Sequence, residues 1–584
     1  MPSYSDERSV QLLVSLLKQH GVRNIVASPG STNICVVYSV QNDDFFKVYS
    51  SVDERSAAYI ACGLAAESAE PVVLVCTGAT ASRNYYPGLT EAYYRKLPVL
   101  VVTCSQFFGR VGRMVPQVID RTRLPKDVAR ASVQVPMTTD DETEWSNALL
   151  INEAILASVG QGGGPAHINL ETNYSKSSFG VKQIREARPV FLCEPGDVLP
   201  ACPKGSIAIF SGSHGRWGNG LVSDVERFCE RYDAVVICDQ TSNYPGAHRV
   251  DPELVCNQRT YDTPLKDIDL LVHIGEISGA YMSLRPKQVW RVSSDGKLSD
   301  QFRALSYVFQ MSEEMFFSRY ADFPGEDAPL PHGGKSQLQR WRDECDTMRA
   351  KLPELPFSNI WVAQQSSQMV PEGSVIHFGI LNSLRSWNFF EPPMKTTGYC
   401  NTGGFGIDGC LSSMIGSALA SPEKLHFAFV GDLAFFYDMN SLGNRHVSSN
   451  LRILLVNNGC GAEFKLYSHT ASQLDSDADA FIAAAGHYGH QSEVLVKSYV
   501  ESLGFEYLSA ADKDGWLQAA LRFFDLAPRE KPMVFEVFTT PEDESEALRL
   551  VRSTGVSAEG AAKDLARSVL SDKTIKVLKK VLRK

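Results

Sequence analysis

The chain has 584 residues, of which 44% are hydrophobic and 21% charged, with a formal net charge of −10. This length allows three or four ordinary domains, and the composition is that of a soluble globular protein. The negative charge argues against a general nucleic-acid binder. No apolar run is long enough to span a bilayer, and the first residues lack the pattern of a signal peptide. Thirteen cysteines without a CxxC pair indicate small buried side chains in a reducing compartment, so we expect a cytoplasmic protein.

The first 182 residues alternate between helical and apolar segments. An amphipathic helix is expected over 7–20, with Gly21 at its end. The further expected elements are strand 22–27, helix 54–67, strand 72–77, helix 84–95, strand 99–103 and strand 166–170. Solid apolar strands that alternate with helices are typical of a parallel sheet covered on both faces. We therefore predict a doubly wound α/β domain over 1–182.

The same rhythm returns twice further along the chain. Strands at 207–210, 234–238 and 270–274 predict a central α/β domain over 183–337, whose Pro/Gly-rich stretch 322–335 is typical of a linker. A third α/β domain is predicted over 338–545, with strands at 426–430 and 451–456 and helical character at 437–446. Residues 546–584 are expected to form a helical tail. Its last part, 571–584, carries six Lys/Arg and one Asp, which fits a solvated helix packed on the body or a membrane-surface helix.

Polar side chains follow the two strands expected in the third domain. Asp432 comes directly after the first strand and Asn458 after the second. Because the carboxyl ends of parallel strands meet at one edge of the sheet, these side chains are expected to lie close together. Their oxygens, with the backbone carbonyl of Cys460 just beyond, would suit Mg²⁺, which fills its remaining positions with phosphate and water. The sequence thus predicts a metal-anchored diphosphate. The alternative is that Gly-Asp and Asn-Asn are turns that only end the strands.

Three parts of the chain are informative together: Asp53–Ala58, Asn401–Gly409, and Gly431–Leu433 with Tyr437–Asn440. They resemble one enzyme superfamily, the thiamine-diphosphate-dependent 2-oxo-acid decarboxylases and carboligases. Within it the chain looks most like the menaquinone-pathway synthase that joins isochorismate to the semialdehyde unit of 2-oxoglutarate. The likeness is close over the first 120 residues and over 375–470, and it extends to the central domain only in architecture. Ser28–Ser31 and Asn382–Leu384 add to the likeness.

The resemblance implies three domains. The first binds the pyrimidine of the cofactor, the second is a central domain, and the third binds the diphosphate of the cofactor. It implies that Glu54 is the carboxylate that bonds N1′ of the aminopyrimidine; the alternative is an ordinary acid at a helix start, beside the cap Asp53. Ile407 would be the apolar wedge beneath the bent cofactor. Further implied cofactor contacts are Ser383, Gly406, Asp432, Leu433 and Phe464, and Asp432, Asn458 and Cys460 would hold Mg²⁺ or Mn²⁺. Because Glu54 and Asp432 lie in different domains, the family arrangement implies a homodimer or homotetramer.

The chain departs from that synthase at its substrate positions. The family has arginines, which grip carboxylates in a bidentate manner, at four positions where this chain has Thr32, Gln106, Trp387 and Thr402. The matches Ser31 and Gln117 are kept, the first as a substrate contact and the second as a catalytic candidate. Arg385, Arg110 and Arg113 lie nearby in the sequence and would re-supply positive charge in another geometry. We therefore predict a different 2-oxo acid, such as pyruvate, with Trp387 stacking a bulky acceptor.

The segment after Asn458 also differs, since Glu463 and Tyr467 stand where the synthase has aliphatic side chains. Glu463, near the expected reaction centre, is a candidate proton donor if it is buried. The alternative is a charged side chain turned to solvent at a helix start.

The leading hypothesis is a thiamine-diphosphate enzyme that decarboxylates a 2-oxo acid and releases an aldehyde or transfers the acyl anion to an acceptor. The runner-up is the menaquinone-pathway synthase reaction itself, with relocated arginines. A different class is an NAD-linked dehydrogenase, because the turn Gly212–Gly220 is rich in glycine, although its spacing is GxxGxxG and not GxGxxG. A non-catalytic homologue is disfavoured by the joint presence of Glu54, Asp432 and Asn458.

Overall fold

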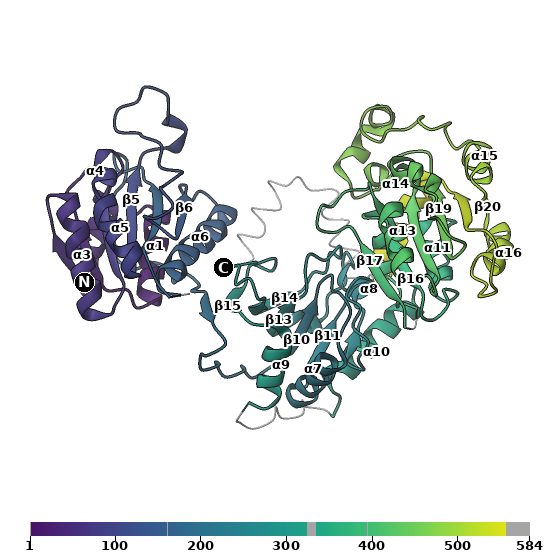
Figure 1. Cartoon of the computed structure of the whole chain (residues 1–584), viewed down its shortest axis with the longest axis horizontal. Helices are drawn as coiled ribbons and strands as arrows, with labels where there is room; N and C mark the ends of the chain where they lie inside the picture. Colours follow the sequence, from purple (N-terminus) through teal and green to yellow (C-terminus); the bar gives the residue numbers. More distant parts are fainter. Residues whose placement is uncertain (1, 161, 324–333, 394, 556–584) are drawn as a thin grey trace. The chain divides into compact units, whose positions relative to one another are not determined.

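The computed structural model describes residues 2–160, 162–323, 334–393 and 395–555 (Figure 1). They divide into two compact units, of which unit 1 spans Met1–Leu199 and Ser294–Met311 and unit 2 spans Pro200–Ser293 and Ser312–Lys584. The basic tail predicted at 571–584 lies outside the described residues, as does most of the predicted linker. None of the described helices has both the length and the apolar composition needed to cross a membrane.

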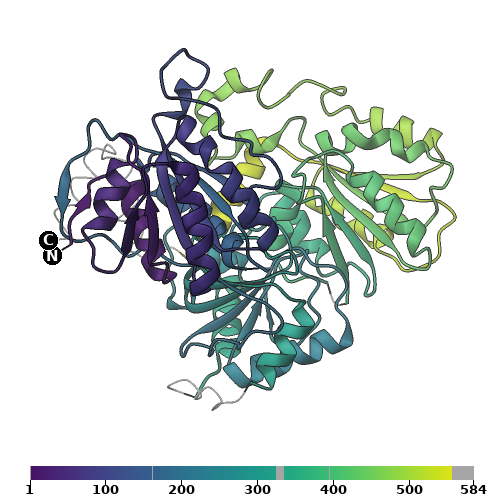
Figure 2. The same cartoon turned by 60° about the vertical axis from the view of Figure 1, so that its left-hand side comes forward.

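Unit 1 is built on a parallel sheet with the strand order β3-β2-β4-β5-β7-β6. The strands are β2 (Asn24–Ala27), β3 (Lys47–Ser50), β4 (Val72–Thr77), β5 (Val99–Ser105), β6 (Ala131–Val135) and β7 (Ala166–Glu171). Apolar side chains of α1 (Arg8–Gln19), α2 (Ile34–Gln41) and α6 (Asp141–Val159) cover one face, and those of α3 (Glu54–Ser68) and α5 (Tyr86–Arg95) cover the other. The fully apolar strands are explained by this cover on both sides. The blue and purple elements of Figure 2 show the helices running beside the strands.

Smaller elements complete unit 1. The short helix α4 (Thr80–Asn84) precedes α5, and β1 (Tyr4–Ser5) pairs antiparallel with β8 (Phe179–Val181). A parallel pair joins β9 (Phe191–Cys193) to β15 (Leu305–Phe309), so the segment 294–311 returns to this unit from the middle of the chain.

Unit 2 contains two parallel sheets. In the central sheet the order is β12-β11-β10-β13-β14. Its strands are β10 (Ile207–Ser211), β11 (Val235–Ile237), β12 (Arg249–Val250), β13 (Asp267–Ile274) and β14 (Arg285–Val292). The helices α7 (Asn219–Tyr232) and α9 (Glu313–Ala321) pack together through Phe228, Phe316 and Phe317. The short α8 (Glu253–Cys256) follows β12, and the longer α10 (Gln337–Ala350) follows the predicted linker.

The second sheet of unit 2 has six parallel strands in the order β17-β16-β18-β19-β21-β20. They are β16 (Val375–Phe378), β17 (Thr397–Cys400), β18 (His426–Gly431), β19 (Leu451–Asn457), β20 (Glu506–Ala510) and β21 (Met533–Phe538). Its helices are α11 (Asn359–Ser366), α12 (Asn382–Asn388), α13 (Cys410–Ala420), α14 (Asp432–Asp438), α15 (Leu495–Ser502), α16 (Lys513–Phe523) and α17 (Pro541–Arg552). Side chains of α13, α14 and α15 form one core with β18 and β19. In Figure 1 these green and yellow elements surround the sheet.

The prediction of three doubly wound parallel sheets is confirmed. The bounds expected for the helix over 437–446 are wrong. Instead, α14 begins at Asp432, directly after β18, and passes at Met439 into the 3-10 turn η3 (Met439–Gly443). At its last residue, the side chain of Asp438 accepts hydrogen bonds from the backbone N–H and hydroxyl of Ser412. The domain boundaries at 182, 337 and 545 stay predictions.

Candidate cofactor and metal site

Asp432 and Asn458 lie at the carboxyl edge of the six-stranded sheet, at the ends of neighbouring parallel strands. Gly431 of β18 is in register with Val456 of β19. The backbone N–H of Gly459 donates to Oδ2 of Asp432 at 2.8 Å, so the turn after β19 folds onto the first residue of α14. The structure thus brings together the two side chains that follow the two strands in the sequence.

Both side chains have oxygens suited to a cation. Oδ1 of Asn458 is buried and has no hydrogen-bond partner in the described part of the chain. Burial raises the pKa of the Asp432 carboxyl to about 7, against the opposing backbone N–H groups of Leu433 and Gly459. A buried amide oxygen without a donor and a desolvated carboxylate are both stabilised by a cation. The pair therefore fits Mg²⁺, which takes few protein ligands.

The third expected ligand, the carbonyl of Cys460, lies in the same turn, where it accepts the N–H of Ala462 at 2.9 Å. A carbonyl oxygen has a second lone pair, so this bond leaves room for a metal. Among the described residues no group of three or more His, Cys, Asp or Glu side chains could hold a metal. The candidate centre is thus one carboxylate, one amide and one carbonyl.

The neighbouring loops at this edge hold the other predicted cofactor contacts. Ser383 is buried near the start of α12, just after Leu381, whose φ of +69° is rare for a residue with a side chain. Phe405, in the glycine-rich loop before α13, has a φ of +54°. Strained backbone of this kind concentrates at functional sites. Gly406 follows Phe405, and Ile407 packs its half-buried side chain against the core of α13 and β18.

Leu433 and Phe464 lie near each other beside the metal edge. A Cβ placed on Gly461 would lie 3.1 Å from the ring of Phe464 and 3.4 Å from Leu433, so the glycine lets the turn approach both side chains. Phe464 packs with Cys460 and Ala462. Tyr467 is half-buried three residues further on, and its N–H donates to the hydroxyl of Ser545.

Glu463 and Arg385 form an ion pair that the sequence did not predict. Nη1 of Arg385 donates to Oε2 of Glu463 at 2.7 Å and Nη2 donates to Oε1 at 3.1 Å. Asn382 accepts a further bond from Nη1 at 3.1 Å. This bidentate contact stabilises the ionised carboxylate. Glu463 is thus paired with Arg385 and not turned to solvent. The roles of Glu463 as a proton donor and of Arg385 toward a substrate stay predictions.

The central sheet holds α12 in place through Gln240. Its Nε2 donates to the carbonyls of Trp387 and Phe390 at 3.0 and 2.9 Å, and its backbone N–H donates to Oδ1 of Asn388 at 3.1 Å. Because α12 carries Ser383, this buried contact positions a predicted cofactor residue. Sequence reasoning missed Gln240, since nothing in its local pattern points to a helix more than 140 residues away.

Glu54 is the first residue of α3 in unit 1, directly after the cap Asp53, whose Oδ1 accepts the N–H of Ser56 at 2.8 Å. Because Asp53 caps the helix, Glu54 is free for another role. Its Oε2 accepts a long hydrogen bond of 3.4 Å from Asn84. Glu54 also lies close enough to the buried Tyr85 and Cys76 for its charge to raise the pKa of both groups, although burial is the larger cause.

The predicted substrate positions of unit 1 are mostly bonded within the protein. Thr32 is buried, and its hydroxyl bonds Thr77 and the carbonyl of Cys104. Gln106 accepts a hydrogen bond from Arg110. Ser31 is half-buried, and Gln117 is exposed with a φ of +64°.

A buried cation nearby was missed by sequence reasoning. Arg121 donates to the carbonyl of Gly78 and to Oδ1 of Asn169, and it is 2% exposed. Arg113, by contrast, is exposed, so it offers its charge at the surface.

In unit 2, Thr402 and Trp387 are both buried. Trp387 packs against Phe378 and Phe429 with ring centroids 5.3 and 4.3 Å away. This corrects the expectation that its ring stacks on an acceptor, because the ring is part of the sheet core and is 1% exposed.

The glycine-rich turn after β10 does not form an open dinucleotide site. A Cβ on Gly212 would lie 1.9 Å from the carbonyl oxygen of Glu276, so the turn is packed against the loop after β13. Asp239, after the neighbouring strand β11, accepts bonds from the N–H and hydroxyl of Thr241 and from the hydroxyl of Ser278. A ribose hydroxyl that binds Asp239 would have to displace the donors of Thr241 and Ser278. The structure thus disfavours the NAD alternative.

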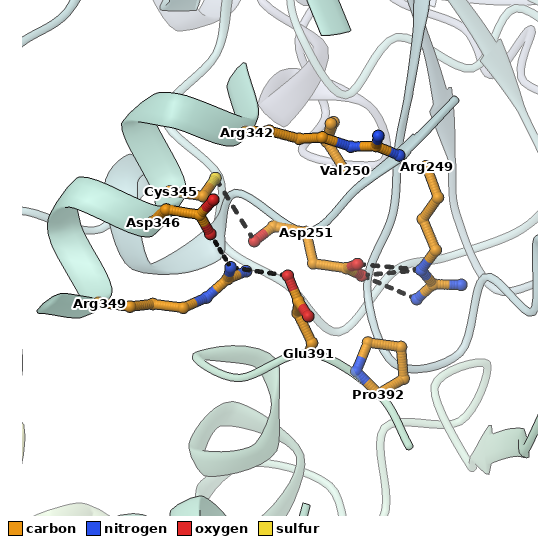
Figure 3. A pocket seen from close by; sticks show the side chains of 9 residues that line it. All are labelled: Arg249, Val250, Asp251, Arg342, Cys345, Asp346, Arg349, Glu391 and Pro392. Carbon is orange, nitrogen blue, oxygen red and sulfur yellow. Dashed lines mark hydrogen bonds and ion pairs between the residues drawn. The ribbon is translucent and has the colours of Figure 1, made fainter. Parts of the chain in front are cut away.

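A cavity of about 370 Å³ beside α10 is lined by three arginines, but two of them are neutralised within the protein (Figure 3). Arg249 bonds Asp251 through two nitrogens, and Arg349 lies between Asp346 and Glu391 at 3.1 and 2.7 Å. This arrangement explains the cavity as an ion-pair network.

Comparisons with known proteins agree with the geometry of the sheet edges. Residues 8–124 match the family described as "Thiamine pyrophosphate enzyme, N-terminal TPP binding domain". The chain is 30% identical over 581 residues to the 2-succinyl-5-enolpyruvyl-6-hydroxy-3-cyclohexene-1-carboxylate synthase of Phocaeicola vulgatus, which covers 94% of this chain and 98% of that protein. The chain belongs to the thiamine-diphosphate enzyme family of these synthases.

Other members of this synthase family match over nearly the same length. The Bacteroides fragilis synthase is 30% identical over 565 residues, with 94% of this chain and 98% of that protein covered. The Desulfotalea psychrophila synthase is 29% identical over 545 residues, with 89% and 96% covered. The recognised resemblance is thereby confirmed, and the thiamine-binding match supports thiamine diphosphate as the cofactor.

Proposed function

We propose that this chain catalyses the thiamine-diphosphate- and Mg²⁺-dependent decarboxylation of a 2-oxo acid, with transfer of the acyl anion to an acceptor or release of an aldehyde. The observation that carries the proposal is the pair Asp432 and Asn458, whose buried side chains lie at the carboxyl edge without an ion-pair partner among the described residues. The family membership supports the cofactor.

Each residue has a stated task in this proposal. Asp432, Asn458 and the carbonyl of Cys460 hold Mg²⁺, and Ser383, Gly406, Leu433 and Phe464 contact the cofactor. Thiamine diphosphate supplies the carbanion chemistry that removes CO₂ from a 2-oxo acid. Glu54 would hold a proton at N1′ of the pyrimidine, and Ile407 would contact the cofactor. Gln117 contacts substrate from unit 1. We further propose that a second copy of the chain completes the site, as a homodimer or homotetramer.

The donor is proposed to be a small 2-oxo acid with one carboxylate, such as pyruvate. Support comes from Arg385, whose charge is taken up by Glu463, and from Thr32 and Thr402, which are buried and offer no cation. A second carboxylate on the donor would then lack an arginine partner at these positions.

A second candidate is the synthase reaction itself, with isochorismate and 2-oxoglutarate. It is favoured by the names of the relatives, which match at about 30% identity over almost the whole chain. In this case Arg121, Arg110 or Arg113 would have to bind the carboxylates that the family's arginines bind.

The test is CO₂ release with thiamine diphosphate and Mg²⁺ from pyruvate, 2-oxoglutarate, phosphonopyruvate and sulfopyruvate, with and without isochorismate. Release from pyruvate that is lost in Glu54→Gln supports the first donor. Release from 2-oxoglutarate alone, increased by isochorismate, supports the synthase reaction. Absence of release from every donor, with cofactor bound, would contradict the proposed reaction class.

A further inference from the structure

A cavity of about 530 Å³ lies at the amino edge of the six-stranded sheet, opposite the candidate metal site. Its walls are the loops that lead into four strands: 372–374 before β16, 422–425 before β18, 449–450 before β19 and 526–529 before β21. The six residues of β18 separate it from Asp432 by about 20 Å, at roughly 3.3 Å per residue. The cavity is therefore distinct from the cofactor edge.

Arg452, the second residue of β19, lines this cavity although it is 1% exposed. Its Nη1 donates to the carbonyls of Ser449 and Leu451 at 2.7 and 2.9 Å, but its Nε is buried without a partner. No carboxylate among the described residues lies within ion-pair distance of the guanidinium. A buried cation of this kind is costly unless an anion pairs with it.

A second arginine, Arg529, lies in the wall of the cavity and is paired with Asp525. Its Nε is likewise buried without a partner. Burial, together with the charge of Arg529, lowers the pKa of Arg452 to about 10, while Glu506 and Asp525 act in the opposite direction.

The acids around the cavity are mostly engaged elsewhere. Asp525 pairs with Arg529 at 2.5 Å, Glu372 pairs with Lys395 at 3.1 Å, and Glu506 pairs with Arg522. Glu423 and Lys424 sit side by side on the loop before β18 and offset each other. The charge left without an acid is that of Arg452. The cavity of Figure 3 differs, because there the acids lie between the arginines.

We propose that the amino-edge cavity is an anion-binding site that takes a small phosphate- or carboxylate-bearing molecule, with Arg452 and Arg529 as its ligands. The anion would pair with the guanidinium of Arg452, which lines the cavity. A planar guanidinium suits either group, so phosphate and carboxylate ligands share the chemistry and are separated by experiment. The site is independent of the proposed reaction, because none of its residues contacts the metal edge.

The test is isothermal titration of the full chain, saturated with thiamine diphosphate and Mg²⁺ in low-chloride buffer, with inorganic phosphate and separately with malonate. We expect one site per chain with a Kd below about 1 mM for at least one of the two anions. Arg452→Met should weaken binding about 10-fold or more, because it removes a charge-assisted bond and keeps the apolar stem. Arg529→Gln, on a loop, provides a second variant if Arg452→Met does not fold.

Two controls separate this site from others. Arg445→Gln removes an exposed arginine of the turn between η3 and β19 and should leave binding unchanged. Asp432→Asn, which disturbs the proposed metal site, should also leave it unchanged, whereas loss of binding there would place the anion at the cofactor edge. The proposal is overturned if neither anion binds up to about 10 mM, or if the wild type and both cavity variants bind equally. Binding of phosphate alone or malonate alone supports it and identifies the ligand group.

Discussion

The two parallel sheets of unit 2 have the same architecture, but their carboxyl edges differ. At the central sheet, Asp239 is bonded by Thr241 and Ser278, and Gly212 is packed against Glu276. At the six-stranded sheet, Oδ1 of Asn458 is buried without a donor in the described chain. Both sheets therefore offer a carboxyl edge at which a ligand can bind. The polar atoms at that edge decide whether other groups of the protein or a ligand form hydrogen bonds with them.

The largest effect is expected from Asp432→Asn, at the carboxyl edge of the six-stranded sheet. The variant loses the charge that would hold Mg²⁺ in the proposed site, so we expect the Kd for Mg²⁺ and thiamine diphosphate to rise about 100-fold or more. Calorimetric titration of both ligands measures this. Asp514→Asn, on the surface of α16, is the matched control. Equal cofactor binding by Asp432→Asn and the wild type would contradict the proposed assignment of this edge.

The carboxyl edge of the central sheet contains a buried acid, Glu253, whose replacement should stabilise the folded protein at neutral pH. Glu253 of α8 is 2% exposed, and burial raises its pKa to about 7, with Asp239 adding to the shift and Arg385 opposing it. The folded pKa lies above the unfolded value of 4.5, so the native protein keeps a proton that the unfolded chain releases. Stability contributed by this group therefore falls as pH rises from about 4.5 to about 7, by roughly 3 kcal/mol.

Glu253→Gln removes this pH dependence. We expect the variant and the wild type to have similar stability at pH 4 and the variant to be more stable by about 3 kcal/mol at pH 8. Chemical unfolding across the pH series measures the difference, with Glu314→Gln on the surface of α9 as control. A difference that does not change with pH would show that Glu253 titrates normally.

Gln240→Ala should weaken the contact between the central sheet and α12, which lies beside the six-stranded sheet. The change leaves the carbonyls of Trp387 and Phe390 buried without a donor, which costs about 2 kcal/mol. We also expect weaker cofactor binding, since α12 carries Ser383. Unfolding and titration measure the two effects, and the exposed Gln339→Ala serves as control. Loss of stability with unchanged cofactor binding would limit Gln240 to a structural role.

The smallest expected effect concerns the ion pair between α12 and the turn after β19. Glu463→Gln frees Arg385, which can then bind a second carboxylate on the donor. We expect the KM for 2-oxoglutarate to fall about 10-fold relative to that for pyruvate, a change of roughly 1.4 kcal/mol. Initial rates of CO₂ release give both constants, with Glu493→Gln as control. A ratio that stays constant would show that Arg385 does not reach the donor.

Local patterns in the sequence predicted the sheets because each strand is covered on both faces and is therefore apolar throughout, as in Val72–Thr77 and Leu451–Val456. The same logic placed Asp432 beside Asn458, since parallel strands end at one edge. The sequence did not reveal the partners of Glu463, because Arg385 is 78 residues away and long-range pairing leaves no local pattern.

Arg452 shows a different limit. A single arginine in an apolar strand can reach water with its long side chain, so its sequence context does not distinguish a surface cation from a buried one. The cavity at the amino edge is built from four loops that only the fold brings together. Trp387 illustrates the reverse error, in which a large aromatic residue at a substrate position belongs to the core.

The most direct test of the central claim is exchange of the C2 hydrogen of bound thiamine diphosphate for deuterium, measured by quenched-flow and NMR, because it requires no knowledge of the donor. The account predicts that the wild type with Mg²⁺ exchanges this hydrogen much faster than the free cofactor and that Glu54→Gln reduces the rate about 100-fold. Exchange no faster than in the free cofactor, or a rate unaffected by Glu54→Gln while the cofactor remains bound, would contradict it.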